Sequence, residues 1–82
     1  MSLDAMKIAW SARGVTPVEK LALIYIADSA GDSVWVQRND RLAYWALCTL
    51  SEAAAAVETL YRSGYLGHGV RNGRGPGFWV GL

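Results

Sequence analysis

The sequence predicts one small domain of the α+β class, mainly α, with a three-helix core, one short strand and a C-terminal β-hairpin. Three features of the chain lead to this expectation. The segments at 16–19 and 49–52 each carry a helix-capping pattern followed by apolar residues at helical spacing. Between them lies one short β-type run, at 33–36. The end of the chain is glycine-rich and contains two short apolar pieces that suit a hairpin.

Residues 1–15 are expected to form an N-terminal arm or a short helix, followed by the main domain at 16–82. Within this first segment, Met6 or Trp10 can pack inward, and Gly14 interrupts the chain.

The first core helix is predicted over about 17–30. Thr16 suits the N-cap, Pro17 the first helical position, and Glu19 completes a capping box. This helix is apolar nearly all round, so we expect it to be the central buried one. Gly31-Asp32 ends it, and residues 33–36 are long enough for one strand.

A second helix is expected from Asn39-Asp40 to about residue 47, with Leu42 and Ala43 in the core and Cys48 in the following turn. The third helix then starts at a capping box and ends near Gly64. Its residues at helical spacing define one buried stripe: Ala53, Ala56, Val57 and Leu60. Two short extended pieces, 65–67 and 78–80, are then expected to flank a flexible glycine-rich tip.

Composition excludes several classes of protein. Eight basic residues against seven acidic ones leave a net charge of +1, which is weak support for nucleic-acid binding. The basic residues are unevenly placed, however, since residues 68–82 contain arginines and no acid. One cysteine rules out an internal disulfide or a cysteine-built zinc site and fits a reducing compartment. The absence of a long apolar run argues against a membrane span or a secretory signal, so we expect a cytoplasmic protein.

The order helix, strand, helix, turn, helix, hairpin resembles the winged helix-turn-helix domains of phage and prophage replication proteins and transcriptional regulators. The first helix and strand of that family are similar to the segment TPVEKLALIYIADSAGDSVWV, and its second and third helices to RLAYWALCTLSEAAAAVETLYRSGYL. The Leu42-Ala43 pair, the cap at Thr49 and the closing pattern of Leu60, Gly64 and Leu66 match the motif. The resemblance covers about residues 16–82 and implies double-stranded DNA binding in transcription regulation or replication initiation.

The chain departs from the family pattern on the surface that would meet DNA. Leu47 stands where family members usually have a glycine in the tight turn. On the third helix, small or apolar residues replace the usual Arg, Lys, Gln or Asn, so bidentate base contacts are not available. Contacts to the DNA backbone are therefore expected to dominate. The candidate DNA-binding residues are Arg38, Arg41, Thr49, Ser51, Ala54, Ala55, Arg71 and Arg74. For the arginines, the plainer interpretation is a solvated surface.

A protein-interaction module is the alternative, with a homodimer or a host protein as the partner. Aromatic residues at outward positions of the second helix can form a continuous apolar patch with the start of the third helix. Its candidate residues are Tyr44, Trp45, Leu50 and Ala54, with Leu47 and Ala55 beside them. In the plainer interpretation, Trp45 folds back on the N-terminal arm near Trp10 and enlarges the core.

Catalysis has little support in the sequence. His68 is the single histidine and is expected in a flexible loop. Cys48 precedes a helix N-terminus, which can lower a thiol pKa, but burial as a small core residue is favoured. We therefore expect no enzymatic activity, no cofactor, no metal and no small-molecule ligand.

Overall fold

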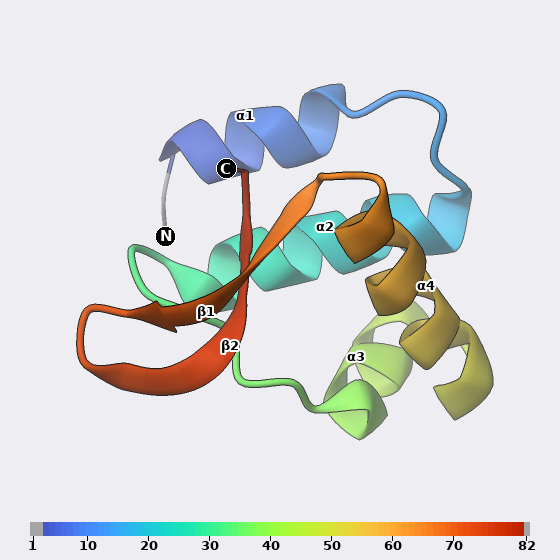
Figure 1. Cartoon of the computed structure of the whole chain (residues 1–82). Coiled ribbons are helices and arrows are strands. Elements are labelled where there is room, and N and C mark those ends of the chain that lie inside the picture. Colours follow the sequence, from blue (N-terminus) through green and yellow to red (C-terminus); the bar gives the residue numbers. More distant parts are fainter. Residues whose placement is uncertain (1–2, 82) are drawn as a thin grey trace.

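The computed structural model describes residues 3–81, without the side chain of Arg74, and has an α+β fold that is mainly helical (Figure 1). Its elements in chain order are α1 (Leu3–Ser11), α2 (Pro17–Ala30), α3 (Asn39–Ala46), α4 (Leu50–Arg62), β1 (Leu66–Arg71) and β2 (Arg74–Val80). Helices α1 and α2 lie side by side, α3 and α4 form the other end of the molecule, and the hairpin crosses in front of α2. Within residues 3–81, no helix is both long and apolar enough to cross a membrane.

The N-terminal segment, expected as either an arm or a short helix, is a helix. Ala5 and Ala9 of α1 are buried, and Met6 packs partly against the core. The expectation that Trp10 could pack inward is wrong, because its side chain is 63% exposed. The ammonium of Lys20 donates to the carbonyl oxygens of Trp10 and Ala12, which fixes the end of α1 to α2.

Helix α2 is the central element, as predicted. Thr16 and Glu19 form the expected capping box, with the Glu19 amide donating to the Thr16 hydroxyl at 3.1 Å and the Thr16 amide donating to the Glu19 carboxylate at 2.9 Å. Because α2 packs against α1, α3, α4 and β2, most of its surface is covered. Its buried residues are Ala22, Leu23, Ile24, Ile26, Ala27 and Ala30.

The strand predicted at 33–36 is reduced to a single bridge. The Trp35 amide donates to the Phe78 carbonyl oxygen at 2.7 Å, and the Phe78 amide donates back at 2.9 Å. This close approach requires the glycine at 77, since a Cβ there would lie 2.5 Å from the Trp35 carbonyl oxygen. Residue 35 thereby connects the hairpin to the segment between α2 and α3.

Helices α3 and α4 pack against each other and against α2. Leu42 and Ala43 of α3 are buried as predicted. The predicted stripe of α4 is confirmed in full, because its buried residues are Ala53, Ala56, Val57 and Leu60. The predicted stop is confirmed as well, since Gly64 follows the helix with a φ of +85°.

The hairpin is longer and more tightly held than predicted. Its strands extend into the glycine-rich segment, so the tip is only Asn72-Gly73, with φ angles of +52° and +78°. An Asn-Gly pair between two strands is the usual signal for such a two-residue turn. The Asn72 side chain donates to the Asp32 carbonyl oxygen. The Ser33 hydroxyl donates to the Arg71 carbonyl oxygen at 3.0 Å. These bonds tie the tip to the loop after α2.

A large side chain explains one of the hairpin glycines. The indole of Trp79 lies over β1, where a Cβ at residue 67 would come within 2.4 Å of the ring. At Gly69 a Cβ would lie 3.6 Å from the ring, which is an ordinary contact, and it is the φ of +152° that favours glycine there. Both glycines belong to β1 and do not form a flexible loop.

Gly77→Ala is expected to lower the free energy of unfolding by about 1–3 kcal/mol, because an added methyl would force the hairpin away from Trp35. Gly75→Ala is the matched control, since a Cβ at that position meets no atom within 4 Å. Urea-induced unfolding of the two variants measures the difference. Equal stability of Gly77→Ala and Gly75→Ala would contradict the role given to the bridge.

Candidate functional site

The candidate site is the surface formed by α3, the turn after it, the exposed face of α4 and the hairpin. Ser51, Ala54 and Ala55 are exposed on α4, so small side chains occupy the centre of this surface. A groove of about 340 Å³ runs between α4 and the hairpin. It is lined by Gln37, Ala54, Val57, Glu58, Tyr61 and Phe78.

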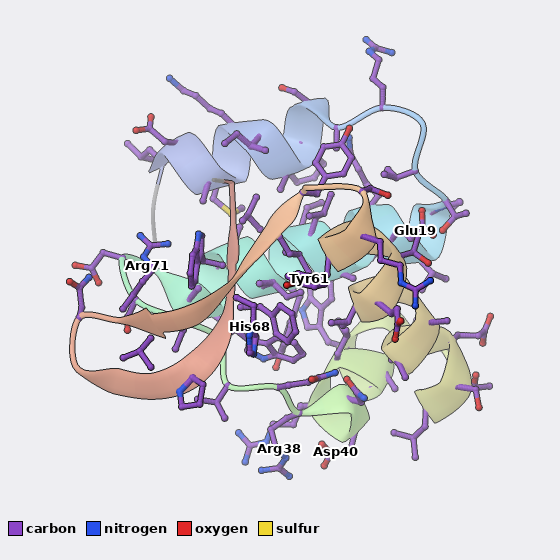
Figure 2. The ribbon with its side chains drawn as sticks, viewed as in Figure 1. Glu19, Arg38, Asp40, Tyr61, His68 and Arg71 are labelled. Atoms are coloured by element: carbon purple, nitrogen blue, oxygen red, sulfur yellow. The ribbon has the colours of Figure 1, made fainter. Side chains whose placement is uncertain are left out.

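Tyr61 and Phe78, which line this groove, form a cluster of three aromatic rings with His68. Figure 2 shows Tyr61 and His68 close together between α4 and the hairpin. The ring centroids of His68 and Phe78 are 4.5 Å apart, and Tyr61 meets both rings edge-on at 6.2 and 6.0 Å. The expectation of a loop position for His68 is wrong, because His68 lies on β1 directly opposite Phe78. This cluster was missed because it depends on the hairpin register.

Arg38 and Arg41 differ in how available their charges are. Arg38 donates to both carboxylate oxygens of Asp40, at 3.1 and 2.8 Å. The hydrogen bonding lowers the pKa of Asp40 and, with the Coulomb attraction of Asp40, raises the pKa of Arg38. Among the residues that the structure describes, Arg41 has no carboxylate within ion-pair distance. Arg41 is therefore the more available cation at the start of α3.

Arg71 lies away from this surface. Its guanidinium carbon is 4.7 Å from the centre of the Trp79 ring, in a cation–π contact. Arg71 also lines a hollow of about 520 Å³ together with Asp4 and Ile8 of α1. In Figure 2, Arg71 and Arg38 lie on opposite sides of the hairpin. The structure therefore does not bring Arg71 together with Arg38 and Arg41, and the side chain of Arg74 is outside what it describes.

The start of α4 is capped as predicted. The Glu52 amide donates to the Thr49 hydroxyl, and the Thr49 amide donates to the Glu52 carboxylate, both at 3.0 Å. This backbone hydrogen bond from Thr49 lowers the pKa of Glu52. Further along α4, Glu58 pairs with Arg62 at 2.7 Å. Glu58 is thus paired with a cation, whereas Glu52 keeps its negative charge at the start of α4.

An apolar face adjoins the site at the end of α3. Tyr44 is 76% exposed, Trp45 48%, Leu47 93% and Leu50 59%. Trp45 rests on Tyr25 of α2, with ring centroids 5.4 Å apart. The interpretation in which Trp45 folds onto the N-terminal arm near Trp10 is therefore wrong. A hollow of about 470 Å³ lies beside these rings, lined by Tyr25, Asp40, Arg41, Tyr44 and Trp45.

The turn between α3 and α4 holds a leucine in the left-handed conformation, with φ 55° and ψ 47°. The amides of Leu47 and Cys48 both donate to the Ala43 carbonyl oxygen, which closes the helix. Glycine would adopt this left-handed conformation without strain. Cys48 is half-buried, and burial raises the pKa of its thiol. The alternative from the sequence, in which the helix N-terminus lowers this pKa, is therefore wrong.

Comparison with known proteins finds no matching family model, no matching curated protein and no matching solved structure. The functional argument therefore rests on the geometry and charges of this chain.

Leu47→Gly is expected to raise the free energy of unfolding by about 0.5–1 kcal/mol, because glycine adopts positive φ without a Cβ clash. The substitution loses little packing, since the leucine is almost fully exposed. Leu50→Gly is the matched control at an exposed helical leucine and should destabilise by about 0.5–1 kcal/mol. Thermal unfolding at low protein concentration checks both signs. Destabilisation by Leu47→Gly would contradict the strain assigned to this turn.

The capping box of α4 predicts a pH dependence of stability. Because the folded-state pKa of Glu52 is lowered, its ionised form stabilises the fold above the ordinary glutamate pKa of 4.5. That stability is lost as the pH falls through the lowered value. Glu52→Gln should therefore be less stable than the wild type at pH 7, and the gap should close in acid. Urea unfolding at a series of pH values measures it, and a constant gap would contradict the capping role.

Proposed function

We propose that the chain is a winged helix-turn-helix domain that binds double-stranded DNA mainly through the phosphate backbone. In this assignment α3 and α4 are the helix-turn-helix, α4 is the helix that enters the major groove, and the hairpin is the wing. The observation that carries the proposal is the uncovered start of α4. It exposes Ser51, Ala54 and Ala55, and Ala54 lines the groove that α4 shares with Phe78 of the hairpin.

Small side chains at the start of α4 allow this helix to approach DNA closely, but they make few specific contacts to bases. A face of alanine and serine lets the helix axis come near the groove floor, and alanine methyls can contact thymine methyls. The Thr49 hydroxyl oxygen accepts from the Glu52 amide, so the hydroxyl protons of Thr49 and Ser51 are both available to donate to a phosphate or a base. Selectivity among sequences is accordingly weak.

The charges of the surface also favour weak, salt-sensitive binding. Arg41 supplies an available cation at the start of α3, and Arg74 follows the tip of the wing. Arg38 contributes less, because Asp40 holds its guanidinium at 2.8 Å. Arg71 contributes to folding the hairpin through Trp79. By its resemblance, the domain would act in phage-type transcription regulation or replication initiation.

A protein-interaction role is the second candidate, and a separate observation favours it. Leu47 projects from the turn with 93% of its surface exposed, and Tyr44 and Leu50 are exposed beside it. Exposed apolar side chains of this kind are typical of protein contacts. Contact with DNA phosphates would give them no favourable interaction. In this role, the helix-turn-helix would present its turn to another protein.

Asp40→Asn is expected to strengthen binding to a mixed-sequence duplex, because it removes one acid and frees Arg38. Arg41→Ala is expected to weaken it and to reduce the slope of log affinity against log salt by about 1. Fluorescence anisotropy with a labelled duplex at several salt concentrations measures both changes. Lys7→Ala is the control, since Lys7 lies on α1, away from α3 and α4.

Absence of duplex binding at low salt would overturn the DNA-binding proposal. An equal loss of affinity in Lys7→Ala and Arg41→Ala would place any binding on a different surface.

A further inference from the structure

We infer that the hollow between α1 and the hairpin is a binding site for a small zwitterion with an apolar body, such as a free apolar amino acid. Its volume is about 520 Å³, within the roughly 300–1,000 Å³ of most small-molecule pockets. Arg71 lines this hollow and lies on the side of the hairpin away from Arg38 (Figure 2). The inference is therefore independent of both functions proposed above.

The hollow has apolar walls from three parts of the fold. They are Ile8 of α1, Ala30 at the end of α2, and Trp79 and Val80 of β2. Ile8 is 40% exposed and Trp79 is only partly buried, so both retain apolar surface that a ligand can cover. Removing this surface from water favours the binding of an aliphatic or aromatic group.

Arg71 supplies a positive charge that no carboxylate of the chain neutralises. Its guanidinium carbon lies 4.7 Å from the centre of the Trp79 ring, and a cation–π contact leaves the charge in place. Within residues 3–81, no carboxylate lies within ion-pair distance of Arg71. The contact with Trp79 holds a half-buried guanidinium at the hollow. A guanidinium held in this way suits a carboxylate, which it can bind through two parallel hydrogen bonds.

Asp4 supplies the opposite charge from α1. It lines the same hollow as Arg71, yet the two side chains do not form an ion pair. Among the described residues that line the hollow, these two carry the charges, so the charges sum to zero. A purely anionic ligand would be repelled by Asp4, and a purely cationic one by Arg71. A zwitterion instead places its carboxylate at Arg71 and its ammonium at Asp4.

The sequence did not predict this site, since it indicated no small-molecule ligand. Asp4 and Arg71 are far apart along the chain, and Arg71 was expected in a flexible tip. They line one hollow because the hairpin packs on α1. The hydrogen bonds of Asn72 and Ser33 also hold the end of β1 beside the loop after α2.

Titration of the ¹⁵N-labelled protein with L-phenylalanine tests the inference, with L-valine as a smaller apolar amino acid in parallel. The indole N–H of Trp79 and the backbone amides of Gly31 and Gly81 are expected to shift. A dissociation constant of about 1 mM suits a ligand of so few atoms. Hydrocinnamate lacks the ammonium of phenylalanine, and phenethylamine lacks its carboxylate. Each should bind about tenfold more weakly, because each leaves one charge of the site unpaired.

Two variants assign the charges of the ligand to the two side chains. Asp4→Asn should weaken phenylalanine binding about tenfold and bring it close to that of hydrocinnamate. Asp28→Asn is the matched control, since Asp28 is an exposed acid of α2 that does not line the hollow. Arg71→Lys should weaken the binding of both carboxylates, because lysine lacks the planar fork of arginine. The amide spectrum of each variant shows whether it is folded.

Absence of shifts at Trp79, Gly31 and Gly81 with either amino acid at about 20 mM would overturn the inference. So would equal affinities for phenylalanine and its two analogues, or an Asp28→Asn protein that loses as much affinity as Asp4→Asn. These titrations contain no DNA, so their failure is distinguishable from failure of the duplex titration.

Discussion

The pair of hydrogen bonds between Trp35 and Phe78 determines how the rest of the molecule is arranged. A two-stranded ribbon alone is marginal in water, and this bridge joins the hairpin, which also packs on α1, α2 and α4, to the segment between α2 and α3. The bridge works because a glycine at 77 lets the backbones approach and because Trp35 is buried beneath Tyr25 and Phe78. The bonds of Asn72 and Ser33 then hold the far end of the hairpin. As a result, the hairpin is held beside α4, and the two elements form the groove between them.

On the candidate surface, most charged side chains already have an ion-pair or hydrogen-bond partner within the chain. Arg38 is paired with Asp40, Arg62 with Glu58, and Glu52 with the cap of α4. In the proposed DNA-binding role, such a surface would bind a polyanion weakly and read few bases. The apolar end of α3 is the complementary feature, because its strained and exposed leucine favours a protein contact.

Much of the helical framework could be predicted from the sequence, because its signals are local. The capping boxes at Thr16 and Thr49, the stripe of α4 and the stop at Gly64 each follow from residues within one or two helical turns. The hairpin could be predicted only in outline. Its strand register, the cradle for Trp79 and the placement of Arg71 depend on residues that meet across strands. The pairing of Trp35 with Phe78 joins positions far apart in sequence, so a short run at 33–36 was expected to be a full strand. Trp45 was ambiguous for the same reason, since its partner Tyr25 lies on another helix.

If the chain binds DNA as proposed, α3, the start of α4 and the hairpin near Arg74 contact the duplex. Titration of the ¹⁵N-labelled protein with a short mixed-sequence duplex at low salt tests this contact. The backbone amides at the starts of α3 and α4 and near Arg74 are expected to shift, while the amides of α1 stay unchanged. Shifts confined to α1 and the hollow around Arg71, or no shifts at all, would contradict it.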